Sequence, residues 1–294
     1  GKGRAIGEVG FPSLTYLDCS ENLLEELGTA LPPKLEVLDL SRNALAELPD
    51  KQLELCKRLR VLNGSRNKLR KVPDALGKCY KIEDLDLSHN RIGKMNGGCV
   101  RLLLAMTRLD LSHNKLEEIP WELSKCWKLH TLNLRNNQLK ALVDVGPPPP
   151  PPDARQRARG ITNEEQMCWR GLERLDLAHN DLAELPASLL EHGSKLEALT
   201  LDHNYLERLP RPGLFAALAN LQVLTLRQND LPYAPPYLLE RLDGLRCLDI
   251  SGNPFNGLPA HALVDGSSGA LALTELGESD QAPLEEEEGG EEEE

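Results

Sequence analysis

The sequence predicts an α/β solenoid, a horseshoe with a concave parallel sheet and 3₁₀-helical, helical or irregular outer segments. Asparagine recurs at a nearly constant step of 21 to 25 residues, apart from one step of 43 residues. Each asparagine ends the pattern L-x-x-L-x-L-x-x-N, with conservative replacements. Repeats of this length cannot bury their apolar faces alone, so the units must stack into one elongated domain. The ten asparagines, which number the units one to ten, are Asn22, Asn43, Asn67, Asn90, Asn114, Asn137, Asn180, Asn204, Asn229 and Asn253.

Each unit contains a short strand followed by an inward turn. Leu38 and Leu40 alternate with Asp39, which is the period of a strand whose leucines face the core. Strands separated by returning segments of similar length must be parallel. The asparagine follows in the turn, where its carboxamide donates to and accepts from backbone groups of neighbouring turns, so we expect a ladder of asparagines. Gly64 leaves one core position without a side chain, and we expect looser packing in unit three.

The outer segment of most units begins with proline. The repeat continues as x-L-x-x-L-P, as at Ile119 and Pro120, and proline ends the sheet because it fixes φ and lacks an amide hydrogen. Apolar residues then return at a spacing of three, as at Leu123 and Cys126, which predicts a helical or 3₁₀ turn behind the sheet. The prolines are Pro49, Pro73, Pro120, Pro186, Pro210, Pro235 and Pro259.

These residues resemble the leucine-rich repeat family, in its intracellular form of about 23 residues with the L-x-x-L-P continuation. The resemblance extends from about Phe11 to Leu263. The sub-type is similar to Ras-pathway scaffold proteins, plant intracellular Ras-group proteins, and the repeat domains of Roco kinases and leucine-rich phosphatases. The resemblance implies a non-catalytic protein-protein interaction scaffold in intracellular signalling or assembly. The implied partner is a small GTPase, a phosphatase or kinase subunit, or a cytoskeletal assembly.

Charge divides the chain into a solenoid and a tail. We expect an N-terminal flank at 1–10, a solenoid of ten repeats at 11–270 and an acidic tail at 271–294 that charge repulsion keeps disordered. The net charge is −12, but the tail holds eleven acids and no Lys or Arg, which leaves −1 for residues 1–270. A nearly neutral solenoid predicts no general attraction to nucleic acid. No signal peptide or membrane-length apolar run is visible, so we expect no membrane partner. We also expect a monomer.

The one long step contains a proline-rich insertion at about 143–166. Pro147–Pro152 form an uninterrupted run, and such a run forms a polyproline helix that SH3, WW or EVH1 domains bind. However, Asp153 and Ala154 separate the run from the first arginine, and no aromatic residue completes a familiar ligand motif. The sequence therefore favours a loop that protrudes from the outer side.

The candidate functional site is the concave face. The residues beside the inward leucines carry an acidic bias, and eight of 20 arginines but none of 14 lysines lie on this face. Arginine is enriched at protein interfaces because its guanidinium forms bidentate pairs and is less costly to desolvate. The alternative is that aspartates and arginines of adjacent strands merely neutralise one another. The candidate binding residues are Arg42, Arg66, Asp86, Arg108, Asp110, Arg135, Arg174, Asp176 and Arg227.

Four histidines, His89, His113, His179 and His203, directly precede a ladder asparagine. A histidine stripe suggests a metal site or a pH switch. No cysteine or carboxylate converges with them at metal-site spacing, so repeat position explains them better. The sequence also lacks a Gly-rich phosphate loop, an H-E-x-x-H motif and a nucleophile elbow. We therefore expect no enzyme activity, no metal and no cofactor.

Cysteine usage indicates the compartment. The seven cysteines form no C-x-x-C pair, and Cys56, Cys79 and Cys126 fit core positions, as expected for thiols in a reducing environment. We expect a cytoplasmic location, with the nucleus as the alternative. Two other functions stay open: the recognition segment of a larger kinase, GTPase or phosphatase, and a nuclear acidic histone-binding or phosphatase-regulating protein, whose acidic extension the tail resembles. The chain begins with Gly1, which leaves open that it is part of a longer protein.

Overall fold

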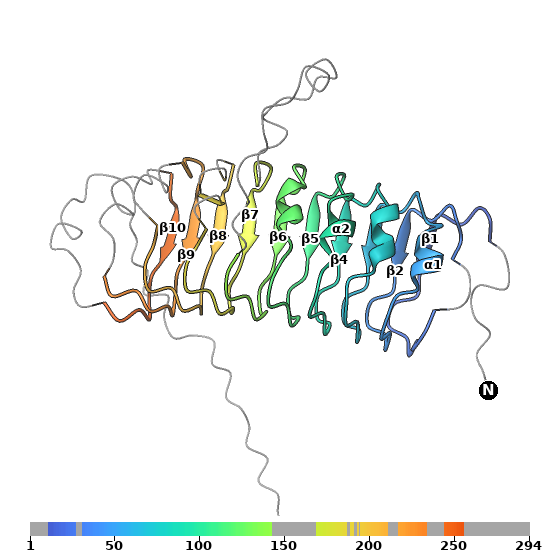
Figure 1. Ribbon diagram of the computed structural model, residues 1–294, viewed down its shortest axis with the longest axis horizontal. Coiled ribbons are helices and arrows are strands. Elements are labelled where there is room, and N and C mark those ends of the chain that lie inside the picture. The colour runs from blue at the N-terminus through green and yellow to red at the C-terminus, as the bar shows by residue number, and fades with distance from the viewer. Residues whose placement is uncertain are drawn as a thin grey trace, which may run out of the picture.

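Ten short parallel strands form one sheet whose strands follow the order of the chain, as the computed structural model shows in Figure 1. The described residues are 11–27, 31–142, 169–186, 189–190, 193, 195–210, 217–233 and 244–255. The proline-rich insertion and the acidic tail lie outside these ranges. The strands are β1 (Tyr16–Asp18), β2 (Val37–Asp39), β3 (Val61–Asn63), β4 (Asp84–Asp86), β5 (Arg108–Asp110), β6 (Thr131–Asn133), β7 (Arg174–Asp176), β8 (Ala198–Thr200), β9 (Val223–Thr225) and β10 (Cys247–Asp249).

The register of the sheet places equivalent repeat positions side by side. In β5, for example, Leu109 lies opposite Leu85 of β4 and Leu132 of β6. These central leucines are buried, whereas the residues on either side of them are partly or fully exposed. Each strand therefore contributes two side chains to the concave face, and successive strands arrange them in continuous rows. The predicted concave parallel sheet is confirmed.

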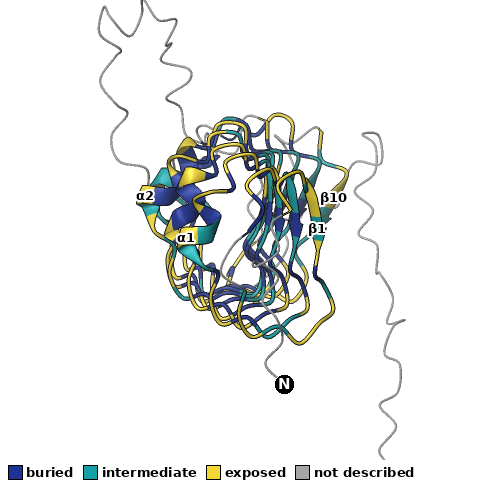
Figure 2. Cartoon of the chain, turned by 90° about the vertical axis from the view of Figure 1, so that its right-hand side faces the viewer, coloured by how far each residue is buried: buried dark blue, intermediate teal, exposed yellow. Residues whose placement is uncertain are grey.

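Short helical segments return the chain behind the sheet in units two to five. They are α1 (Asp50–Leu53), η1 (Asp74–Lys78), α2 (Gly97–Val100) and η2 (Trp121–Lys125). Each packs against its neighbour along the stack, and Figure 2 shows buried residues both in these segments and along the strands. This confirms the outer segments that the spacing of three predicts.

Proline starts three of these helical segments. Pro49, Pro73 and Pro120 occupy the N-cap positions of α1, η1 and η2 with extended backbone. Unit four lacks this proline, and Asn96 replaces it as the N-cap of α2. Its Oδ1 accepts a hydrogen bond from the amide of Gly98 at 2.8 Å, which satisfies one of the unpaired amides of the first turn.

The asparagine ladder runs through the stack. Asn114 donates through Nδ2 to the carbonyls of Leu87 and Leu111, both at 3.0 Å, and its Oδ1 accepts from the amide of Ile92 at 2.9 Å. From unit two onward, each asparagine thus binds its own unit and the preceding one. The ladder also crosses the long step, because Asn180 Oδ1 accepts from the amide of Leu139 at 3.1 Å. The insertion therefore leaves the stacking of units six and seven intact.

Unit three is well packed despite its glycine. A Cβ on Gly64 would lie 3.0 Å from Leu87 Cδ2 and 3.6 Å from Leu69 Cδ1. The leucines of the same unit and the next unit fill the space that the missing side chain leaves. The expectation of looser packing at this point is therefore wrong.

Candidate protein-binding face

Three rows of side chains make up the concave face and its border. The first row comes from the first residue of each strand and the second row from the third residue, since alternate residues of a strand face the same side. The third row is formed by the residues that directly precede the ladder asparagines. Strand pairing holds neighbours within the first two rows about 4.8 Å apart. In the middle of the sheet the first row consists of Asp84, Arg108, Thr131 and Arg174 in successive strands.

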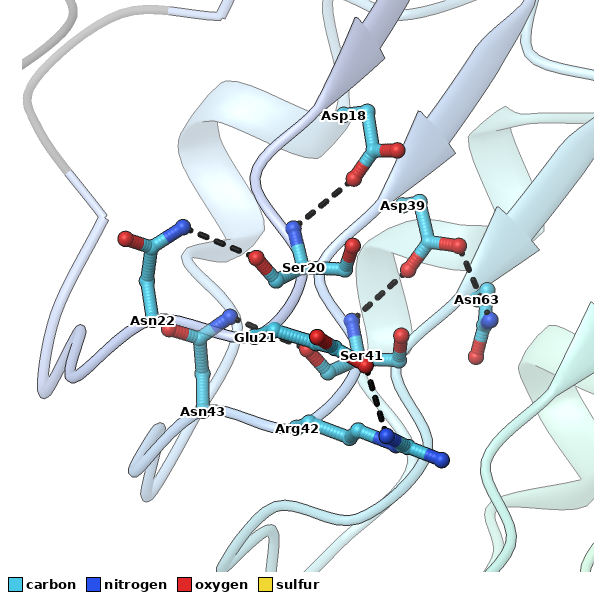
Figure 3. A network of polar contacts seen from close by, with 9 residues as sticks. All are labelled: Asp18, Ser20, Glu21, Asn22, Asp39, Ser41, Arg42, Asn43 and Asn63. Carbon is cyan, nitrogen blue, oxygen red and sulfur yellow. Dashed lines mark hydrogen bonds and ion pairs between the residues drawn. The ribbon is translucent and has the colours of Figure 1, made fainter.

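The second row has a structural role. Asp39, Asp86, Asp110 and Asp176 each accept, through Oδ1, a hydrogen bond from the amide two residues further on, at 2.8 to 3.0 Å. An aspartate in such an Asx turn shapes the chain where it leaves the strand. Figure 3 shows this contact between Asp39 and the amide of Ser41. The acidic bias of the concave face therefore has a local cause.

Neighbouring units also contact each other within the second row. Asp39 Oδ2 accepts from Asn63 Nδ2 at 3.0 Å (Figure 3), and Asp110 Oδ2 accepts from Asn133 Nδ2 at 3.0 Å. Both carboxylate oxygens of Asp110 are thus engaged within the protein. Burial raises the pKa of Asp176, against the opposing effect of its hydrogen bond from the following turn. A partner that approaches this row meets groups whose hydrogen bonds are largely satisfied.

The second row changes character in β8 and β9, before Asp249 of β10 restores the aspartate contact. Thr200 and Thr225 replace the aspartates in these two strands. Thr225 Oγ1 is the one buried side-chain oxygen or nitrogen without a hydrogen-bond partner among the described residues. Asp202, from the turn after β8, accepts from the amide of Arg227 at 2.9 Å. In these units the aspartate contact thus comes from the turn and not from the strand.

The first row carries the charges that are most available to a partner. Arg108 Nη1 lies 3.9 Å from Asp84 Oδ2, and the Arg108 side chain keeps 54% of its exposure. This distance is at the outer limit of an ion pair, and exposed pairs contribute about 0–1 kcal/mol. Burial raises the pKa of Asp84, while Arg108 lowers it. Arg174 is exposed and has no carboxylate within 4.0 Å among the described residues.

The third row adopts an unusual backbone conformation. Its members in units one to nine have φ between 53° and 56°, and Gly252 in unit ten has a φ of 69°. This left-handed region is costly for most residues, whereas glycine, asparagine and histidine tolerate it best. The predicted site residues Arg42 and Arg66 belong to this row and not to the strands. Arg42 forms an ion pair with Glu21 at 2.6 Å (Figure 3).

The four histidines of the third row form two stacked pairs. The rings of His89 and His113 lie 4.0 Å apart, and those of His179 and His203 lie 4.1 Å apart. Burial and the neighbouring imidazole lower the pKa of His89 and likewise that of His179. Asn136 Nδ2 extends the first pair by contacting His113 Nδ1 at 3.0 Å. In the described part of the chain, no group of three or more His, Cys, Asp or Glu residues is placed to hold a metal ion.

The nine predicted site residues thus fall into four sets. Arg108 and Arg174 lie in the first row, the three aspartates lie in the second, and two arginines lie in the third. Arg135 and Arg227 come from the turns after β6 and β9. Sequence reasoning identified the histidine stripe but missed the backbone conformation that it shares with the third-row arginines. Glycine in the same row of unit ten was the available signal, because glycine favours positive φ.

Comparison with known proteins identifies the repeat. A leucine-rich-repeat model matches residues 33–92 and 170–231. A model of two leucine-rich-repeat copies matches residues 105–146, and a further leucine-rich-repeat model matches residues 244–265. The chain belongs to the leucine-rich repeat family. No curated protein sequence matches this leucine-rich repeat protein.

Solved structures with the same fold come from different biological settings. The functional domain of InlJ from Listeria monocytogenes, which includes a cysteine ladder, matches at a TM-score of 0.62 and 22% identity, over 85% of this chain and 47% of that one. A leucine-rich repeat protein of Leptospira interrogans matches at 0.59 and 23%, over 84% and 69% of the two chains. A chain of the octameric complex of Latrophilin 3, Unc5D and FLRT2 matches at 0.60 and 23%, over 84% and 77%. These identities establish the fold alone.

The leucine-rich repeat chain is shorter than several of these neighbours. It spans about half the length of the InlJ chain, at 47%. It spans 30% of the ectodomain of the plant membrane receptor kinase GASSHO1/SCHENGEN3 from Arabidopsis thaliana, which was solved in complex with CASPARIAN STRIP INTEGRITY FACTOR 2. Among the described residues of this chain, no helix has the length and apolar character needed to cross a membrane.

Proposed function

We propose that this leucine-rich repeat protein is a non-catalytic scaffold whose concave face binds a protein partner. The observation that carries the proposal is the exposed pair of arginines in the first row, Arg108 and Arg174. They flank Thr131 on the sheet, one strand away on either side. A hydrogen-bonded sheet presents these guanidinium groups on fixed backbone, and Arg174 keeps its hydrogen-bonding capacity for a partner.

The partner and the setting follow from the sequence resemblance. The L-x-x-L-P continuation supports an intracellular role in signalling or assembly, in the cytoplasm. The partner is a small GTPase, a phosphatase or kinase subunit, or a cytoskeletal assembly. In this proposal the solenoid at 11–270 performs the binding, while the insertion at about 143–166 and the tail at 271–294 are accessory to it. The complexes formed by other proteins of this fold support the assignment.

The test is site-specific capture with a matched charge control. A photo-crosslinking amino acid replaces Thr131, between the two arginines, or Gln138, an exposed residue just after the ladder asparagine of the same unit. Each probe is placed in the unaltered chain, in R108E/R174E, and in the control K68E/K115E, which makes the same charge change outside the strands. Captured proteins are identified by mass spectrometry from the source cells, and their affinities are then measured with purified components.

The expected result is one partner that crosslinks to the Thr131 probe and not to the Gln138 probe. Its affinity should fall about a hundredfold in the arginine variant, because two central arginines of an interface contribute several kcal/mol. The lysine control should bind normally. Equal capture from both positions, or unchanged affinity in the arginine variant, would overturn the proposal.

The acidic tail supports a second candidate, a nuclear protein that binds histones or regulates a phosphatase. Its eleven acids carry almost the whole net charge of the chain. This function requires the carboxylates of the tail and not the concave face. Replacing Glu285–Glu288 and Glu291–Glu294 by glutamine should then abolish binding to histones, and binding by the unaltered chain should weaken steeply with salt. If binding to basic proteins survives the replacement, the second candidate fails.

The third candidate is the recognition segment of a larger kinase, GTPase or phosphatase. The resemblance of the repeats to those of Roco kinases and leucine-rich phosphatases supports it. Sequencing of the full transcript decides this case, because the candidate requires an open reading frame that joins the repeats to a catalytic domain.

A further inference from the structure

A second surface lies on the chain that returns from the outer helical segments to the sheet. In units two to five, the last four residues before the next unit read LCKR, KCYK, LLLA and KCWK. We name these residues, 55–58, 78–81, 102–105 and 125–128, the outer patch. The second residue of each block is buried, and all the others are exposed except the partly buried Ala105. The outer patch contains six cationic residues and no acid.

The four blocks stack in register. Cys79 Sγ donates to the carbonyl of Leu53 at 3.3 Å, and Cys126 Sγ donates to the carbonyl of Val100 at 3.7 Å. In both cases the buried residue of one unit contacts the outer helical segment of the unit before it. Equivalent exposed residues of successive blocks therefore form rows, as they do on the concave face.

One of these rows is apolar in three successive units. Tyr80, Leu104 and Trp127 occupy the third position of their blocks, and they are 54%, 47% and 47% exposed. Leu102, in the first position of its block, adds a fourth large apolar side chain that is 44% exposed. Single exposed apolar residues are ordinary on protein surfaces, but an aligned group of this kind is typical of a binding site.

The cations beside this row form no close ion pair among the described residues. Lys78, Lys81, Lys125 and Lys128 have no carboxylate within 4.0 Å in the described ranges. Lys128 Nζ lies over the ring of Trp127, 5.0 Å from its centroid. These ammonium groups therefore stay available beside exposed apolar surface.

We propose that the outer patch binds an acidic peptide segment of a partner protein, one that also carries apolar side chains. The blocks follow one another along the stack, so an extended peptide laid across the units passes over successive blocks. Its apolar side chains cover Tyr80, Leu104 and Trp127, and its carboxylates pair with the lysines on either side. Desolvation by the apolar contact strengthens each of these ion pairs.

An anionic membrane is the other ligand with this chemistry, and the structure favours the peptide. Asp74 and Glu122 lie in the first turns of η1 and η2, the segments that lead into two of the blocks. A flat anionic bilayer would bring lipid head groups against these carboxylates as well as against the lysines. A peptide one chain wide follows the cationic rows and avoids the acids.

The test is fluorescence anisotropy with three labelled probes and the full chain. The first probe is a short peptide in which pairs of glutamates separate leucines and one phenylalanine. The second replaces its apolar residues by glycine, and the third replaces its glutamates by lysine. Each is titrated with the unaltered chain, with K81E/K128E, with Y80S/W127S, and with the control K68E/K115E. Circular dichroism checks that each variant is folded, and vesicles of phosphatidylcholine with phosphatidylserine test lipid binding.

The acidic apolar peptide should bind the unaltered chain and the control alike. Both outer-patch variants should bind it at least about tenfold more weakly, and the glycine and lysine probes should bind as poorly. Equal affinity in K81E/K128E would overturn the proposal, as would binding to vesicles without binding to the peptide. Replacing the eight glutamates of 285–288 and 291–294 by glutamine tests the remaining occupant. If this replacement raises peptide affinity about tenfold, the acidic tail of the chain itself occupies the outer patch and the assignment to a partner is wrong.

Discussion

Removing one ladder asparagine should destabilise the protein by an amount that depends on its place in the stack. In the structure, the amide of Ile92 donates its hydrogen bond to Oδ1 of Asn114. Asn114→Ala removes this acceptor. The carbonyls of Leu87 and Leu111 lose one donor each but keep another, from Asn90 and Asn137 respectively. A buried amide left unpaired costs about 1–3 kcal/mol, and the weakened carbonyl sites add about 1 kcal/mol. We expect a loss of about 2–4 kcal/mol.

Two further variants make this prediction specific. Asn22, in unit one, donates only to Cys19 and Ser20 of its own turn and is exposed, so Asn22→Ala should cost less than about 1 kcal/mol. Asn114→Asp keeps an acceptor for the amide of Ile92 but turns a buried carboxylate towards carbonyl oxygens. It should destabilise more than Asn114→Ala, because like partial charges then face one another without water.

The assay is urea unfolding followed by circular dichroism and by tryptophan fluorescence. Coincident transitions with an unchanged slope justify a two-state free energy of unfolding. Separate transitions in Asn114→Ala would show that the two halves of the stack unfold independently. That outcome would also support the prediction, because it means that the lost hydrogen bonds had coupled neighbouring units. If Asn114→Ala and Asn22→Ala shift the midpoint equally, the bonds between units do not provide the stability assigned to them.

Three further predictions concern backbone conformation, pH and thiol reactivity. Arg66 has a φ of 54°, which is strained for residues other than glycine. Arg66→Gly should therefore stabilise the protein by up to about 1 kcal/mol, and Arg66→Val should destabilise it by about 1–2 kcal/mol. Equal urea midpoints for the two variants would contradict this backbone strain. The lowered pKa values of His89 and His179 mean that the unfolded chain binds their protons more tightly, so stability should fall as the pH drops below the ordinary histidine value of about 6.5. H89Q/H179Q should lose less stability than the unaltered chain between about pH 7.5 and pH 5.5, and parallel profiles would exclude these histidines as the cause. Burial raises the pKa of Cys79 to about 12, whereas Cys247 is exposed. Peptide mapping after alkylation should therefore find Cys247 labelled in the folded protein and Cys79 labelled only in denaturant. Labelling of both thiols at the same rate would show that Cys79 is accessible.

The sequence was sufficient to predict the scaffold because the scaffold depends on residues that recur. Leu109 and Asn114 occupy positions that every unit repeats, and a single strand-turn unit explains both. The role of Asp110 was harder to predict, because a carboxylate on a concave strand looks like a binding residue. Its two oxygens accept from the Ser112 amide and from Asn133, and those contacts depend on how the chain leaves the strand.

Other features depend on how successive units meet. The alignment of Tyr80, Leu104 and Trp127 spans three units, so none of the three is unusual within its own repeat. The aromatic stacking of His89 on His113 likewise requires the distance between adjacent turns. The concave binding residues remain a prediction, because binding depends on a second molecule whose shape this chain does not encode.

The asparagine ladder also gives the chain a direction. The amide that follows each ladder turn finds its acceptor in the next unit, as Leu45 does in Asn67 and Leu69 does in Asn90. A unit therefore becomes complete only when its successor has folded against it. On the ribosome, where the N-terminal units emerge first, the growing edge of the stack would always carry one unfinished turn, and each new unit would close the turn of its predecessor while opening its own. Assembly from the N-terminus onward thus never requires a completed turn to be reopened.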